Sequence, residues 1–103
     1  MKTFKSGPTK IIKLEYPSEL SEMQELKQEL KQLSQFFEVL VDLTYVHYVT
    51  REFMDIMIEL KNNEPGLYER VKMLNPSPLV TEMLEAKGIT QIYEVQNIYP
   101  TAW

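Results

Sequence analysis

The chain has 103 residues, a formal net charge of -4 and no cysteine, and 44% of its residues are hydrophobic. This length predicts one domain, and the apolar fraction is too high for a disordered chain. The lack of cysteine excludes disulfides, thiolate metal sites and thiol catalysis. The acidic balance argues against nucleic-acid binding, which needs clustered Lys and Arg. Because no apolar run has the length of a membrane span or a secretion signal, we expect a cytoplasmic protein without direct membrane insertion.

The N-terminal residues predict a strand that follows a turn. The run from Thr9 to Tyr16 favours β structure and contains Ile11, Ile12 and Leu14. Gly7-Pro8 before this run is a turn signal. Phe4, ahead of the turn, is compatible with a short first strand that pairs back on the run.

A helix is predicted from Glu19 to about Gln35. Pro17-Ser18 stops the preceding strand, and Ser18 is a suitable N-cap. Acidic residues lie early in the segment and lysines later, an order that suits the helix dipole. The apolar residues recur at spacings of three and four, as expected for one helical face: Leu20, Met23, Leu26, Leu30 and Leu33.

The segment from Phe36 to Thr44 is dense in β-branched and aromatic residues and is nearly continuous in apolarity. This pattern fits a strand covered on both faces in a parallel sheet. After a connection, Thr50 is suited to cap a second helix over about Arg51 to Lys61. The apolar residues that fall together on this helix are Phe53, Ile56, Met57 and Leu60.

Met54 and Ile58 widen that apolar stripe beyond the roughly 100° that an amphipathic surface helix needs. Two interpretations remain open at this point. Neighbouring elements bury both side chains, or both border an exposed apolar patch where a partner docks, since methionine suits adaptable surfaces.

The rest of the chain predicts a strand, a helix and a last strand. The strand covers Arg70 to Asn75. Ser77 and Pro78 suit the N-cap and first position of the helix, and Gly88 suits its C-terminal end. Ile89 to Val95 predicts the last strand. The predicted inner face of this helix consists of Leu79, Val80, Met83 and Leu84.

Strands that alternate with helices predict parallel βαβ units with right-handed crossovers. We therefore expect one α/β domain over residues 1–95 and a C-terminal tail over residues 96–103. Tyr93 is expected to pack inside the fold. The tail, with Tyr99 and Trp103, is expected to cover an edge or to stay loose.

The residues offer little machinery for catalysis or for holding a cofactor. The three glycines are far apart in the sequence, whereas a phosphate-binding loop needs several close together. His47 is the only histidine, so neither a nucleophile–histidine pair nor a multi-histidine metal site can form. Carboxylates near it, Asp42, Glu52 and Asp55, allow an acid–base site; alternatively, His47 ends a strand and Asp42 caps or turns the chain. We expect no enzymatic activity, no cofactor and no bound metal.

Short motifs occur in an order that is informative as a whole. Val41-Asp42-Leu43-Thr44 ends a strand, an apolar connection with Val46, Tyr48 and Val49 follows, and a helix comes next. Residues 71–78 then combine a strand with an Asn-Pro-Ser turn, before a helix, a glycine and a final strand. This order resembles the STAS domain family, the sulfate transporter and anti-sigma factor antagonist domains. The resemblance spans about residues 10–95. It implies an open mixed sheet of four or five strands with helices packed mainly on one face.

The resemblance also implies that the protein binds an anti-sigma factor or a serine-kinase-like regulator. In classical members, the partner kinase phosphorylates a serine at the start of the second helix, and the added charge disrupts the interface. The family's Asp-Ser-Ser-Gly motif falls on Thr50-Arg51-Glu52-Phe53, so Glu52 matches the phosphoserine position and has no hydroxyl. Glu52 either mimics a permanently modified state or belongs to a surface that serves a different partner. The expected partner-binding residues are Thr50, Arg51, Glu52, Phe53, Met54 and Ile58.

Two functions follow from this resemblance. The first is a non-enzymatic interaction module in bacterial signalling, without the serine phosphorylation switch. The second is a cytosolic accessory domain of a membrane transport system that handles a lipid or another small ligand. The chain is expected to be a monomer or a homodimer.

Overall fold

The structure is a computed structural model that describes residues 1–15 and 19–98. In these ranges, five strands form one sheet in the order β1-β2-β3-β4-β5. β1 is antiparallel to β2, and the other neighbouring pairs are parallel. The open mixed sheet confirms the predicted α/β fold. The strands are β1 (Lys2–Ser6), β2 (Thr9–Lys13), β3 (Glu38–Asp42), β4 (Val71–Leu74) and β5 (Glu94–Gln96).

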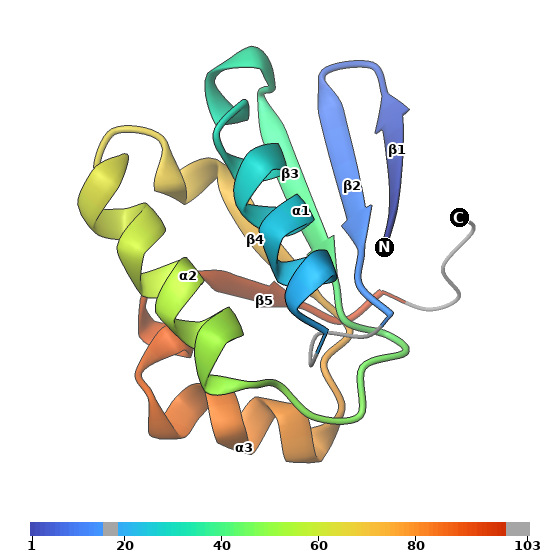
Figure 1. The fold of residues 1–103 in the computed structure, drawn as a ribbon, viewed down its shortest axis with the longest axis vertical. Coiled ribbons are helices and arrows are strands. Elements are labelled where there is room, and N and C mark those ends of the chain that lie inside the picture. The colour runs from blue at the N-terminus through green and yellow to red at the C-terminus, as the bar shows by residue number, and fades with distance from the viewer. Residues whose placement is uncertain (16–18, 99–103) are drawn as a thin grey trace.

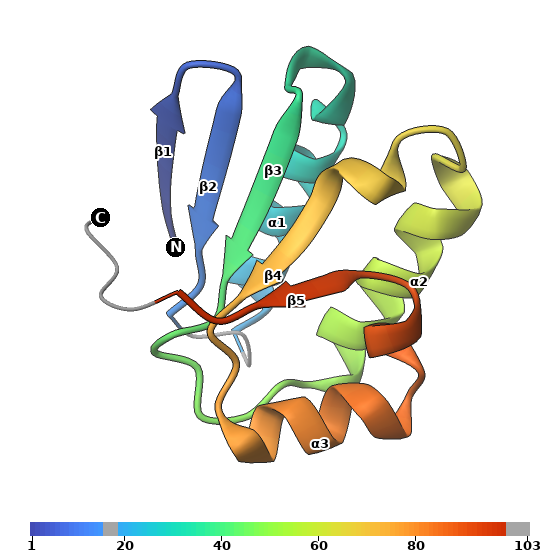
Figure 2. The same cartoon turned by 180° about the vertical axis from the view of Figure 1, so that it is seen from behind.

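The helices are α1 (Leu20–Leu30), α2 (Arg51–Asn63) and α3 (Pro78–Ala86). Each parallel strand is added beside the previous one in the same direction, and right-handed crossovers then place the connecting helices on one face. Figure 1 shows α1 and α2 in front of the sheet and α3 beyond the lower ends of the strands. From behind, no labelled helix lies over the strands (Figure 2). We call this side of the sheet the open face.

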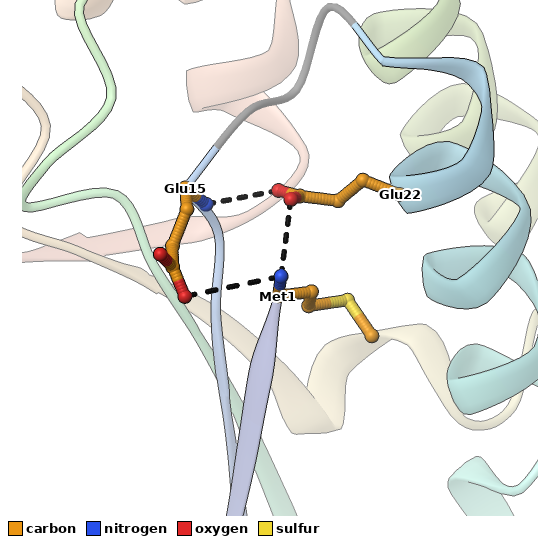
Figure 3. Close-up of polar contacts among 3 residues, drawn as sticks. All are labelled: Met1, Glu15 and Glu22. Atoms are coloured by element: carbon orange, nitrogen blue, oxygen red, sulfur yellow. Dashed lines mark hydrogen bonds and ion pairs between the residues drawn. The ribbon is translucent and has the colours of Figure 1, made fainter.

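The predicted N-terminal hairpin is confirmed. Phe4 of β1 lies opposite Ile11 of β2, and Gly7 at the turn has a φ of 60°, which favours glycine. A cluster of polar contacts fastens the start of this hairpin to α1 (Figure 3). The α-ammonium of Met1 lies 3.1 Å from Oε2 of the buried Glu22, and the backbone N–H of Glu15 donates to Oε1 of Glu22 at 2.9 Å.

The main hydrophobic core lies between the sheet and the helices. β3 contributes Val39 and Val41 to this core, while Leu40, the residue between them, points to the open face. Leu40 is nevertheless only 7% exposed, because it packs with Ile11, Leu74 and Ile98. The side chains of this strand are therefore buried on both faces, as expected. On the open face the burial comes from Ile98 and from residues of the neighbouring strands, not from a described helix.

The first predicted helix is longer than the observed one. α1 ends at Leu30, and a 3-10 turn, η1 (Leu33–Gln35), completes the segment. This tighter turn keeps Leu33 buried in the main core. Glu19 occupies the N-cap position of α1 and makes no side-chain capping bond, while the expected cap, Ser18, lies outside the described residues.

The prediction of a strand from Ile89 to Val95 is wrong for its first part. Gly88 has a φ of 74°, and residues Ile89–Gln91 form a 3-10 turn, η3, that buries Ile89. β5 is short and extends to Gln96. Between them, the buried Tyr93 donates its hydroxyl hydrogen to the carbonyl oxygen of Met57 at 2.5 Å. Burial raises the pKa of the Tyr93 phenol, because a phenolate at that place would lose its hydration.

The residues that the sequence predicted at the start and the end of α3 occupy those positions. The Ser77 hydroxyl oxygen accepts a hydrogen bond from the backbone N–H of Val80 at 3.1 Å, and Pro78 occupies the first turn. Gly88 follows the C-cap residue Lys87 in the left-handed conformation that ends many helices. One part of the prediction is wrong: Leu79 does not lie on the inner face, since it is 56% exposed.

Candidate interaction face

The connection between β3 and α2, residues 43–50, lies at the carboxyl edge of the parallel strands. Figures 1 and 2 both show it running past the first turn of α3. The first turns of α2 and α3 therefore lie at the same edge of the sheet as this connection. In open α/β sheets, loops at the carboxyl ends of the strands commonly form binding sites.

The connection is anchored by apolar side chains and exposes aromatic ones. Leu43, Val46 and Val49 are all at most 2% exposed, whereas Tyr45 and Tyr48 are 59% and 50% exposed. The backbone N–H of Val46 donates to the carbonyl oxygen of Leu43 at 3.1 Å, which closes a turn. Because three buried side chains hold the backbone, the two tyrosine rings are presented from a fixed segment.

The first turn of α2 adds charged residues to this edge. Thr50 caps the helix, as predicted, and its hydroxyl oxygen accepts from the backbone N–H of Phe53 at 3.2 Å. Arg51 is exposed and lies 3.7 Å from Asp55 one turn later. Glu52 is half-buried in the first turn, where a negative charge interacts favourably with the helix dipole.

Phe53 and Met54 do not lie on an exposed patch, and the expectation that they form part of a docking surface is wrong in this respect. They are 0% and 7% exposed and belong to the main core. The reason is that α2 contacts α1 on one side and η3 on another. A helix with two neighbours needs a wider apolar stripe than a helix that covers one surface. Ile58 is partly buried and packs against the same core.

The structure therefore leaves exposed at this edge a set of residues that differs from the expected one. Thr50, Arg51 and Glu52 remain at the edge, while Tyr45, Tyr48 and Leu79 were not predicted to be exposed there. We define the carboxyl-edge face as Tyr45, Tyr48, Arg51, Glu52 and Leu79.

Asp42 lies beneath this face and turns the chain. This agrees with the second interpretation of the sequence, in which Asp42 caps or turns the chain and does not belong to an acid–base site. Its Oδ1 accepts hydrogen bonds from the backbone N–H of Thr44 at 2.9 Å and from the Thr44 hydroxyl at 2.5 Å. His47 is exposed on the connection, outside any strand. The ammonium of Lys13 lies 4.5 Å from the centre of the Tyr45 ring, a cation–π contact that orients this tyrosine.

Within residues 1–15 and 19–98, no three or more His, Asp or Glu side chains come together in a way that could hold a metal ion. None of the described helices combines the length and apolarity needed to cross a membrane.

No protein-family model and no curated relative matches the sequence. Solved structures do resemble it. A serine-to-glutamate variant of RsbS from Moorella thermoacetica has a TM-score of 0.76 at 15% identity, over 94% of this chain and 86% of that one. The chain has the STAS fold. A protein from the molecular architecture of the stressosome, a signal integration and transduction hub, has a TM-score of 0.69 at 15% identity, over 94% and 89% of the two chains.

The STAS fold also occurs within a much longer protein. The murine solute carrier 26 family member A9 anion transporter, in the inward-facing state, is similar over 89% of this chain and 16% of its own length. The TM-score is 0.67 and the identity is 15%. The likeness to RsbS and to this transporter concerns the fold, which the order of sequence motifs predicts.

Proposed function

We propose that this STAS-fold chain is a non-enzymatic protein-interaction module, and that its partner binds the carboxyl-edge face. The observation that carries the proposal is the exposure of Tyr45, Tyr48 and Leu79 at one edge, each at 50% or more. Large apolar side chains exposed together mark interaction surfaces, and tyrosine is enriched in protein interfaces. The neighbouring Arg51 and Glu52 supply charges of both signs at the rim, which favour a specific orientation of the partner.

The class of partner follows from the resemblance. An anti-sigma factor or a serine-kinase-like regulator is the kind of protein that STAS antagonists bind, and the similarity in fold to RsbS supports this choice. The proposal places the protein in the bacterial cytoplasm.

The proposed interaction is not controlled by phosphorylation at the position that matches the family serine. Glu52 carries a permanent negative charge there and has no hydroxyl. The nearby hydroxyl of Thr50 is engaged in capping α2. An acidic residue in a first helical turn contributes about 0.3–1 kcal/mol to stability, so Glu52 has a structural benefit that does not depend on a switch.

Affinity capture with a matched control tests the proposal. The double variant Tyr45→Ser, Tyr48→Ser removes the two rings, while Phe37→Ser removes a ring that is 76% exposed just before β3, at the opposite edge of the sheet. We expect the wild-type chain and Phe37→Ser to retain the same kinase-like or anti-sigma partner, and the double variant to lose it. Equal recovery by all three proteins would contradict the proposal.

A charge reversal tests whether Glu52 contributes to partner binding independently of the two tyrosine rings. Glu52→Arg changes the first turn of α2, and Glu59→Arg makes the same change at an exposed position two turns further along the helix. We expect the first variant to weaken the captured complex and the second to leave it unchanged. The same result for both would argue that Glu52 lies outside the interface.

A further inference from the structure

Asn75, in the turn between β4 and α3, has a backbone conformation that usually calls for glycine. Its φ is 54°, and its side chain is buried, with 5% of the residue exposed. Asparagine tolerates the left-handed region better than other residues, but glycine meets the backbone requirement at lower cost. An asparagine at this place is therefore best explained by what its amide group contacts.

The amide and the backbone of Asn75 join three separate parts of the chain. Its backbone N–H donates to the carbonyl oxygen of Gln96 at 2.9 Å. Its Nδ2 donates to the hydroxyl oxygen of Thr44 at 3.2 Å, and its Oδ1 accepts from the backbone N–H of Ile98 at 2.6 Å. One side chain thus links the β3–α2 connection to the segment that follows β5.

The contact with Thr44 continues to Asp42. A hydroxyl has one hydrogen to donate. Thr44 gives it to Oδ1 of Asp42, so the same oxygen accepts from Asn75. The second carboxylate oxygen, Oδ2, is buried and has no hydrogen-bond partner among the described residues. Asp42 is therefore held by few polar contacts besides those from Thr44, and a displacement of Thr44 changes the whole chain of bonds.

The two ends of this chain of hydrogen bonds lie on different surfaces. Thr44 directly precedes Tyr45 of the carboxyl-edge face. Ile98 packs with Ile11 and Leu40 on the open face of the sheet. A movement at one surface can reach the other through two hydrogen bonds to a single amide group.

We propose that Asn75 is a positioning residue that couples the segment after β5 to the carboxyl-edge face. Displacement of Ile98 from the open face withdraws the hydrogen bond to Oδ1 of Asn75 and loosens Thr44. The presentation of the tyrosines then depends on the state of the open face. The regulatory meaning of this coupling rests on the proposed function; the coupling itself is a property of the free protein.

Hydrogen exchange of the Thr44 backbone amide, followed by NMR, measures the coupling without any partner. Ile98→Pro removes the N–H that donates to Asn75, and Ile98→Ala keeps that N–H while reducing the packing. Asn75→Gly keeps the left-handed backbone accessible and removes the amide. Exchange of the amide of Val41, a fully buried residue of β3, reports any loss of global stability in each variant.

We expect Ile98→Pro to speed exchange at Thr44 about tenfold relative to Ile98→Ala, an effect typical of losing one hydrogen bond. In the Asn75→Gly background, the two Ile98 variants should agree at Thr44 within about twofold, since the link is already absent. An equal effect of Ile98→Pro in both backgrounds, or none in either, would overturn the coupling. Neither result bears on partner capture, so failure of the coupling and failure of the proposed function are separate outcomes.

Discussion

Met54→Ala tests whether the start of α2 belongs to the core or to a surface. Met54 is 7% exposed and packs in the main core, so the substitution removes a buried side chain and leaves a cavity. Such substitutions cost about 2–5 kcal/mol. A loss of about 3 kcal/mol is a large share of the roughly 5–15 kcal/mol that stabilises a small domain. It corresponds to a fall in Tm of about 10–20 °C for a domain of this size.

Urea denaturation followed by circular dichroism gives the free energy of unfolding for the comparison. Tyr48→Ala is the matched control, because Tyr48 is 50% exposed and precedes the same helix; its effect should stay within about 0.5 kcal/mol. The slope of the free energy of unfolding against urea concentration should be the same for both variants as for the wild type. If Met54→Ala is as mild as Tyr48→Ala, Met54 is not a core residue, and the hypothesis of an exposed patch on α2 would return.

Two further results are expected. Glu22→Gln removes the charge partner of the Met1 ammonium and should lower the free energy of unfolding by about 1–3 kcal/mol. The control Glu25→Gln, at an exposed position of α1, should leave the free energy of unfolding nearly unchanged. Equal effects of the two substitutions would contradict the buried ion pair. Native mass spectrometry of the purified chain should give the mass of the protein alone. The groove between α1 and α2, lined in part by Leu30 and Ile56, has a volume of about 180 Å³, below the roughly 300 Å³ of typical ligand pockets. A wider hollow along α1, of about 660 Å³, is lined by polar and charged residues such as Gln24, Glu25 and Lys27, so it offers a lipid no apolar wall. A stoichiometric copurified lipid would instead favour the accessory-domain hypothesis.

The parts of the fold that depend on local chemistry could be predicted from the sequence. The caps at Thr50 and Ser77 and the glycine at position 88 act within one turn of a helix, so their residue types are informative without a structure. The order of strands and helices also followed from periodicity. The resulting STAS fold was predicted from the order of the motifs, because that order reflects the topology.

The candidate site was predicted less well, because exposure depends on which elements meet. The wide stripe of α2 is compatible with two neighbours or with a docking patch, and only the packing of α1 and η3 against it decides that Met54 is buried. In the same way, Tyr45 and Tyr48 alternate with Val46 and Val49, and the sequence does not tell which pair faces the core. The role of Asn75 depends on contacts with residues about 20–30 positions away, beyond the reach of any local pattern.

The most direct test of the interaction face is an NMR titration of the ¹⁵N-labelled chain with the partner that the wild-type protein retains. The backbone amides of Tyr45, Tyr48 and Leu79 should shift or broaden first, because the partner would contact the edge that carries them. Changes confined to Ile11 and Leu40, on the open face of the sheet, would show that the partner binds elsewhere and that the carboxyl edge is not the docking site.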